Sequence, residues 1–248
     1  MEDIKKELDK IAEEFNRQEL KELTDIRRSV RKLIKKVFKP FADEHGFKFH
    51  KPTLLLREYK DTLHIISFEL STADFTCRIA ILPLYVPEDT ISLSFGNRIS
   101  RFKVMLREWW DYKQTEQENE QSLMQIKELL ERNALPWFEE AGSPEGIVSF
   151  IESGKADDPS IALRCPRFIK DLYLGFSYLY LNKYDQAGRL LQAVADSFKG
   201  DTRQWAINTR ELAENMCTLA KERPEEVSIK LQEFIKQTKE NLKLKSYR

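Results

Sequence analysis

The three histidines are the residues best suited to metal binding or acid–base chemistry, and their spacing favours neither. His45 and His50 are five residues apart around a turn, so they do not form the i, i+4 pair that presents two imidazoles to a metal. His64 shares the apolar side of a predicted strand with Ile66 and Phe68, which is typical of a hydrogen-bonded boundary residue. We therefore expect no metal, no cofactor and no histidine-based catalysis.

Nucleophiles and paired carboxylates give no catalytic centre either. The sequence contains no G-x-S-x-G, no phosphate-binding loop and no G-x-G-x-x-G, and it has only 8 glycines. Cys165 lies near a predicted helix start, where a thiolate can be stabilised, but no supporting base is visible and a structural thiol is the favoured reading. The pairs Glu139-Glu140 and Asp157-Asp158 are expected to face water. We assign no catalytic residue.

A cationic run is the first candidate for a binding surface. Seven basic side chains occupy one half of a predicted helical wheel, and apolar residues occupy the other. The basic residues are Arg27, Arg28, Arg31, Lys32, Lys35, Lys36 and Lys39. Such a face is either solvated and partly neutralised by the acidic segment 2–23, or it binds an acidic protein, or it binds nucleic acid. The absence of interleaved aromatic or glycine residues makes nucleic acid the least favoured of the three.

Aromatic residues provide the second set of candidates. Trp109 and Trp110 are adjacent, so on a helix or a strand their rings point in different directions. One ring is expected to anchor the core, and the other to be covered by another element or by a partner, because tryptophans are enriched at interaction hot spots. Tyr178 and Tyr184 are the further candidates, on a predicted helical hairpin where open tyrosines would line a peptide-binding groove.

Composition limits the class of protein. The 248 residues contain 41 basic and 41 acidic side chains, so no net field marks the chain as a nucleic-acid or membrane binder. The N-terminal residues are charged, and no stretch is long and apolar enough to span a bilayer. The three distant cysteines favour free thiols in a reducing compartment. We expect a cytoplasmic protein.

Periodicity predicts an α+β fold. Helices are expected at 2–23 and 26–44, with Thr24 or Asp25 capping the second. Period-two runs at 54–59, 63–70 and 75–84 predict a small antiparallel sheet, covered on one face, and a fourth strand is expected within 91–102. In the third run, Phe75, Cys77, Ile79 and Ile81 share the buried face, and Thr76 and Arg78 point the other way. Apart from this fourth strand, the sequence does not determine the strand content between 86 and 115.

Helical texture returns from residue 116, and Ser143 followed by Pro144 predicts a helix start. A polar linker at 154–160 separates an α+β domain, 1–155, from a helical, repeat-like region, 156–248. Within that region, the helices are expected at 166–182, 184–198, 202–221 and 224–242.

Two segments resemble known families. Residues 26–152 carry FADEHGFKFHK, LLLREYKDTLHIISFELS, FTCRIAIL and LPWFEEAGSPEGIVSFIE, and they resemble the bacterial family called domain of unknown function 4304. That resemblance implies an α+β domain with a small antiparallel sheet and no established activity. Residues 172–198, LYLGFSYLYLNKYDQAGRLLQAVADSF, resemble one tetratricopeptide repeat, and no second copy follows at that period. A lone match favours an ordinary helical hairpin over a peptide-binding array.

These observations favour a bacterial-type, non-catalytic protein–protein interaction or regulatory module. The alternatives are a toxin-neutralising immunity protein, a nucleic-acid-associated accessory factor acting through the basic helix 27–39, and an enzyme with an unrecognised site. The proposed partner-binding residues are Arg28, Arg31, Lys32, Lys35, Lys36, Trp109, Trp110, Tyr178 and Tyr184. The sequence does not determine the partner or the oligomeric state.

Overall fold

The computed structural model describes residues 2–102, 108–158 and 165–244. The first half comprises α1 (Glu2–Glu44), β1 (Lys48–Lys51), β2 (Leu54–Tyr59), β3 (Thr62–Leu70), β4 (Asp74–Pro83), β5 (Gly96–Arg98), the 3-10 helix η1 (Ile99–Phe102) and β6 (Trp110–Asp111). The second half comprises α2 (Glu116–Leu129), the π-helical turn η2 (Leu130–Ala134), α3 (Leu135–Ala141), α4 (Pro144–Glu152), the 3-10 turn η3 (Lys155–Asp157), α5 (Arg167–Tyr180), α6 (Tyr184–Ser197), α7 (Gln204–Glu222) and α8 (Pro224–Asn241). This arrangement confirms the α+β class.

The N-terminal region is one helix, so the expected helix pair is wrong. Instead of capping a new helix, the Thr24 hydroxyl donates to the carbonyl of Leu20 at 2.7 Å, one turn back in the same helix. Asp25 forms an ion pair with Arg28 at 2.8 Å on the helix surface. A cap requires non-helical backbone, and no glycine or proline stands between the two amphipathic segments to provide it.

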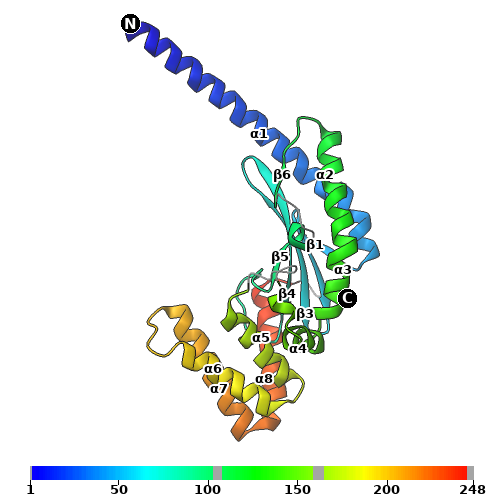
Figure 1. Cartoon of the computed structure of the whole chain (residues 1–248), viewed down its shortest axis with the longest axis vertical. Coiled ribbons are helices and arrows are strands. Elements are labelled where there is room, and N and C mark those ends of the chain that lie inside the picture. Colours follow the sequence, from blue (N-terminus) through cyan, green and yellow to red (C-terminus); the bar gives the residue numbers. More distant parts are fainter. Residues whose placement is uncertain (1, 103–107, 159–164, 245–248) are drawn as a thin grey trace.

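The end of α1 follows the sequence signals. Pro40 lies inside the helix without ending it. Gly46 has the left-handed φ of 73°, and the amide of Phe47 donates to the carbonyl of Ala42 at 2.8 Å, which closes the C-terminus. The second half of α1 packs on the sheet, with the Phe38 ring centroid 4.8 Å from that of Phe68. The first half extends away from the rest of the chain (Figure 1).

The sheet is antiparallel, in the order β1-β2-β3-β4-β5, and β6 also pairs with β4. The three predicted strands are confirmed as β2, β3 and β4, and β5 falls within the range expected for a fourth. Lys60 and Asp61 link β2 to β3 with φ values of 46° and 56°, the left-handed conformations of a two-residue hairpin turn. The short strand β1 was not predicted.

The predicted register of β4 is confirmed. Phe75, Cys77, Ile79 and Ile81 are all at most 1% exposed, on the face that α1 and α3 cover. These residues are paired with the apolar side of β3, so both central strands contribute alternate side chains to the same core.

The other face of the sheet was expected to be wet, and this is wrong. Thr76 is fully buried beneath the segment that leads into β6, and its hydroxyl donates to the carbonyl of Glu108 at 2.7 Å. At the opposite end, α8 returns over the sheet, where the Thr238 hydroxyl donates to the carbonyl of Val86 at 3.4 Å. Arg78 is half-buried between these two covers.

The four predicted C-terminal helices are confirmed as α5 to α8, and Pro224 begins α8. The α5–α6 hairpin closes around Gly175, where an added Cβ would lie 2.9 Å from a methyl carbon of Leu191. Ser143 caps α4 as expected, accepting from the amide of Gly146 at 3.0 Å. Of the predicted linker, 155–157 form η3 with Ala156 buried, and 159–160 lie outside the described residues.

A continuous core joins the sheet to the C-terminal helices. The Tyr85 hydroxyl and the Ser177 hydroxyl are 2.7 Å apart and both buried, and the ring of Tyr173 lies 5.9 Å from that of Phe95. Helix α5 therefore packs against the sheet half, and its Phe176 ring lies 6.3 Å from that of Phe234 of α8. The division into domains at residue 155 stays a prediction.

Candidate functional site

The basic face of α1 is partly neutralised. Arg28 pairs with Asp25 at 2.8 Å, Lys36 pairs with Glu120 of α2 at 2.9 Å, and Lys39 pairs with Asp43 one turn ahead. Two of these carboxylates belong to α1 itself and one to α2.

The centre of this face stays unneutralised. Arg31, Lys32 and Lys35 are exposed, and in the described part of the chain they form no ion pair. Lys32 lines a groove of about 300 Å³ between α1 and the start of α2, where Glu116 stands on the opposite wall. We call Arg31, Lys32 and Lys35 the α1 patch. It lies on the part of α1 whose other side is anchored on the sheet, so its backbone is held in place.

The two tryptophans behave as their adjacency predicts. Trp110 is 8% exposed; it lies 6.5 Å from the ring of Phe75, and its indole N–H donates to Gln125 of α2 at 3.3 Å. Trp109 is half-buried on the opposite face of the sheet, with the guanidinium carbon of Arg98 4.8 Å from its ring centroid. One tryptophan is thus a core anchor, and the other is covered by a side chain of this same chain.

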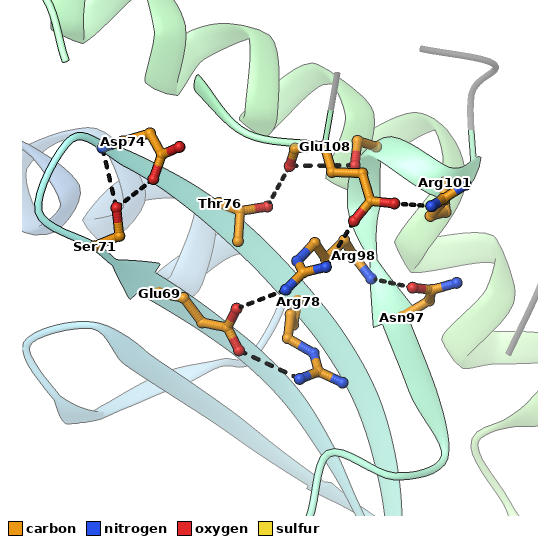
Figure 2. A network of polar contacts seen from close by, with 10 residues as sticks. Glu69, Ser71, Asp74, Thr76, Arg78, Asn97, Arg98, Arg101 and Glu108 are labelled. Atoms are coloured by element: carbon orange, nitrogen blue, oxygen red, sulfur yellow. Dashed lines mark hydrogen bonds and ion pairs between the residues drawn. The ribbon is translucent and has the colours of Figure 1, made fainter. Parts of the chain in front are cut away.

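A charged network fixes the segment that carries Trp109. Figure 2 shows Glu69 between Arg78 and Arg98, at 3.3 and 3.6 Å, and Glu108 between Arg98 and Arg101. Arg98 reaches Glu108 at 2.6 Å. These alternating charges lie across β3, β4 and β5 and hold the chain before β6 against the sheet. The arrangement positions Trp109.

The tyrosine candidates lie in the other half of the molecule. Tyr178 is 5% exposed, and its hydroxyl donates to the carboxylate of Glu152. Burial first, and then the hydrogen bond to Glu152 and its charge, raise the pKa of Tyr178 to about 12. Tyr184 is half-buried and donates to Asn182 at 2.8 Å. The structure does not bring these two tyrosines together with the α1 patch. Tyr112, two residues after Trp110, is close enough to Arg31 for the charge of Arg31 to act on the pKa of its hydroxyl.

Sequence reasoning missed an apolar groove between α7 and α8. It has a volume of about 750 Å³, and Leu212, Met216, Leu219 and Phe234 line it. Ile229, on its rim, is 63% exposed. The sequence indicates this groove only in that α7 and α8 carry more apolar side chains than the two helices bury against each other.

The titratable groups of the core have structural partners. The pKa of His64 is lowered to about 4: burial is the main cause, the hydrogen bond to Gly142 opposes it, and the positive charge of Arg57 adds to it. Burial raises the pKa of Cys77 well above its ordinary value and that of Cys165 to about 12, so neither thiol is activated as a thiolate. Among the described residues, no group of three or more histidine, cysteine or acidic side chains is placed to hold a metal ion.

Comparison of the chain with family models, with curated proteins and with solved structures gave no match. No helix in the described ranges has the length and apolarity needed to cross a membrane.

Proposed function

We propose that the chain is a non-catalytic protein-binding module, and that the α1 patch engages an acidic surface of a partner protein. The observation that carries the proposal is the contrast along one helix. Arg28, Lys36 and Lys39 have carboxylate partners, whereas Arg31, Lys32 and Lys35 between them have none in the described part of the chain. A rigid, unneutralised patch steers an oppositely charged partner and fixes its register.

The size of the patch favours protein over nucleic acid. Three free cations correspond to roughly three phosphate contacts and a slope of log affinity against log salt of roughly −3, which is small for a dedicated nucleic-acid binder. The Glu116 and Glu120 carboxylates of α2 border the patch and would repel a continuous phosphate backbone. A protein surface with a few spaced carboxylates avoids that repulsion.

Free cysteines agree with a cytoplasmic site of action. Cys77, Cys165 and Cys217 are all unpaired thiols, as a reducing compartment maintains them. The partner is accordingly sought among cytoplasmic proteins.

Charge reversal tests the proposal. The variant Arg31→Glu/Lys32→Glu/Lys35→Glu is compared with wild type in affinity capture from the native host, read by mass spectrometry at two salt concentrations. A matched control reverses Arg167, Arg189 and Lys221, three exposed cations of the C-terminal helices. We expect the α1 variant to lose a salt-sensitive protein partner that the control retains. Equal capture by all three proteins, or loss of nucleic acid instead of protein, would overturn the proposal.

A further inference from the structure

A cationic cleft lies between the sheet and α8, away from the α1 patch. Its volume is about 730 Å³, within the range of small-molecule sites. Two acidic side chains line it, Glu58 and Glu240. Five cationic side chains line it, and they are Lys48, Arg57, Lys60, Lys236 and Lys239.

Arg57 is one of the residues that line the cleft. Its Nε and Nη2 groups approach Nδ1 of His64 at 3.2 and 3.0 Å, and Nη1 donates to the carbonyl of His45 at 3.1 Å. The guanidinium carbon also lies 4.8 Å from the ring centroid of Phe47. These contacts use three of the five N–H groups of an arginine, and the other two have no acceptor among the described residues. No carboxylate of the described chain lies within ion-pair distance of Arg57; burial lowers the pKa of Arg57, and the charge of Glu139 opposes that shift.

His64 positions this guanidinium. The histidine is 1% exposed, and its Nε2–H donates to the carbonyl of Gly142 at 2.8 Å. The proton on Nε2 leaves the lone pair of Nδ1 directed at Arg57. The histidine ring also stacks on Phe138 at 4.8 Å. The Arg57 side chain is thus fixed by its contacts with His64, His45 and Phe47.

The lysines come from different parts of the chain. Lys60 lies on the turn between β2 and β3, Lys236 lies on α8, and both are exposed and form no ion pair within the described ranges. Lys239 is instead tied to Glu58 and lies 3.9 Å from Asp61. A fixed arginine and exposed lysines around one cleft match an anion with several oxygens and more than one charge.

We propose that this cleft binds a small phosphate-bearing molecule, with Arg57 as the buried anchor and Lys60 and Lys236 closing over it from the two sides. The proposal does not depend on the function assigned to the α1 patch. Because α8 supplies one wall and the sheet the other, the bound phosphate would bridge the two halves of the molecule. Such a ligand stabilises the folded chain by mass action.

Titration calorimetry and thermal unfolding with inorganic phosphate, pyrophosphate and ADP test this site on the full chain. Citrate serves as the carboxylate control. We expect pyrophosphate or ADP to bind and to raise the midpoint of unfolding, and citrate to have a smaller effect. Tighter binding of ADP than of pyrophosphate would identify a nucleoside phosphate, and the reverse order an inorganic or simple phosphoryl ligand; either order supports the site.

Two variants separate ligand binding from folding. Lys60→Ala/Lys236→Ala changes only exposed side chains and is expected to weaken the affinity by about tenfold or more, whereas Lys183→Ala/Lys221→Ala, exposed lysines outside the cleft, leaves it unchanged. Arg57→Lys keeps the charge but loses the planar fork, and a loss of affinity is expected there as well. Absence of binding by wild type at millimolar phosphate probes, or equal weakening by the control pair, would overturn the proposal.

Discussion

Acid should destabilise this protein through His64. Burial lowers the pKa of His64 to about 4 in the folded chain, from an ordinary value of 6.5. Between these two pH values the unfolded state binds the proton and the folded state does not. The free energy of unfolding therefore falls as the pH falls from 6.5 towards 4, and the contribution is fully present above pH 6.5.

The magnitude follows from the two pKa values. Proton linkage gives a loss of about 2 kcal/mol by pH 5 and about 3 kcal/mol by pH 4 for this one group. His64 is 1% exposed, so solvent screening reduces this figure little. It is a large share of the net stability of an ordinary domain, about 5–15 kcal/mol.

Replacement of His64 by Gln isolates the effect. The Gln amide can still donate to the carbonyl of Gly142, but it removes the titrating ring and its stacking on Phe138. We expect His64→Gln to be less stable than wild type at pH 7 by about 1–3 kcal/mol, because the hydrogen bond with Arg57 and the ring contact are disturbed. The difference between the two proteins should then shrink by about 2 kcal/mol on going to pH 5.

Urea denaturation at several pH values between 4 and 7.5, followed by tryptophan fluorescence, measures both curves. Tyr85→Phe serves as the control, because it removes a buried hydroxyl of similar cost and no group that titrates in this range. Its pH dependence should parallel that of wild type. A constant difference between wild type and His64→Gln across the whole range would refute the reasoning.

Three further predictions concern the core and the junction between the halves. Burial, followed by the charge of Asp89, raises the pKa of Glu88 to about 7, so the folded state holds the Glu88 proton between pH 4.5 and 7. The variant Glu88→Gln should therefore gain stability relative to wild type as the pH rises through that range. The shift in melting temperature between pH 5 and pH 8 measures this gain. Tyr85→Phe and Ser177→Ala should each lower the free energy of unfolding by about 1–3 kcal/mol, because each leaves one buried hydroxyl without its partner. The double variant should lose less than the sum of the two. Additive losses in urea denaturation would show that the two groups are uncoupled. A fragment of residues 156–248 should bind hydrophobic dyes and lack a cooperative thermal transition, since α5 loses its cover, whereas a monomeric, cooperatively melting fragment would establish an independent domain.

The local features of the fold could be predicted from the sequence. Alternation in β4 identified Phe75 and Ile79 as core residues, because a strand turns successive side chains to opposite faces. Pro224 marked the start of α8, because its missing N–H costs nothing at that position. The adjacency of the tryptophans correctly implied that Trp109 and Trp110 would have different surroundings.

Features that depend on distant segments could not be predicted. The cover on the second face of the sheet comes from α8, where Thr238 meets Val86 152 residues earlier. The cationic cleft likewise joins Arg57 to Lys236, which no local pattern connects. The continuity of α1 through Thr24 depends on a local alternative that the sequence leaves open. Threonine is a good N-cap residue, but here its hydroxyl donates to the carbonyl of Leu20 within the same helix.

Photo-crosslinking from the α1 patch tests the proposed function most directly. In one variant of the full chain, a photoreactive amino acid replaces Lys32. In a second variant, it replaces Lys221, which is exposed on α7. We expect the Lys32 position to crosslink, in a salt-sensitive manner, to one protein partner at a stretch rich in Asp and Glu, and the Lys221 position not to do so. Crosslinks to nucleic acid from Lys32, or the same partner captured only from Lys221, would contradict the assignment of the α1 patch as a protein-binding surface.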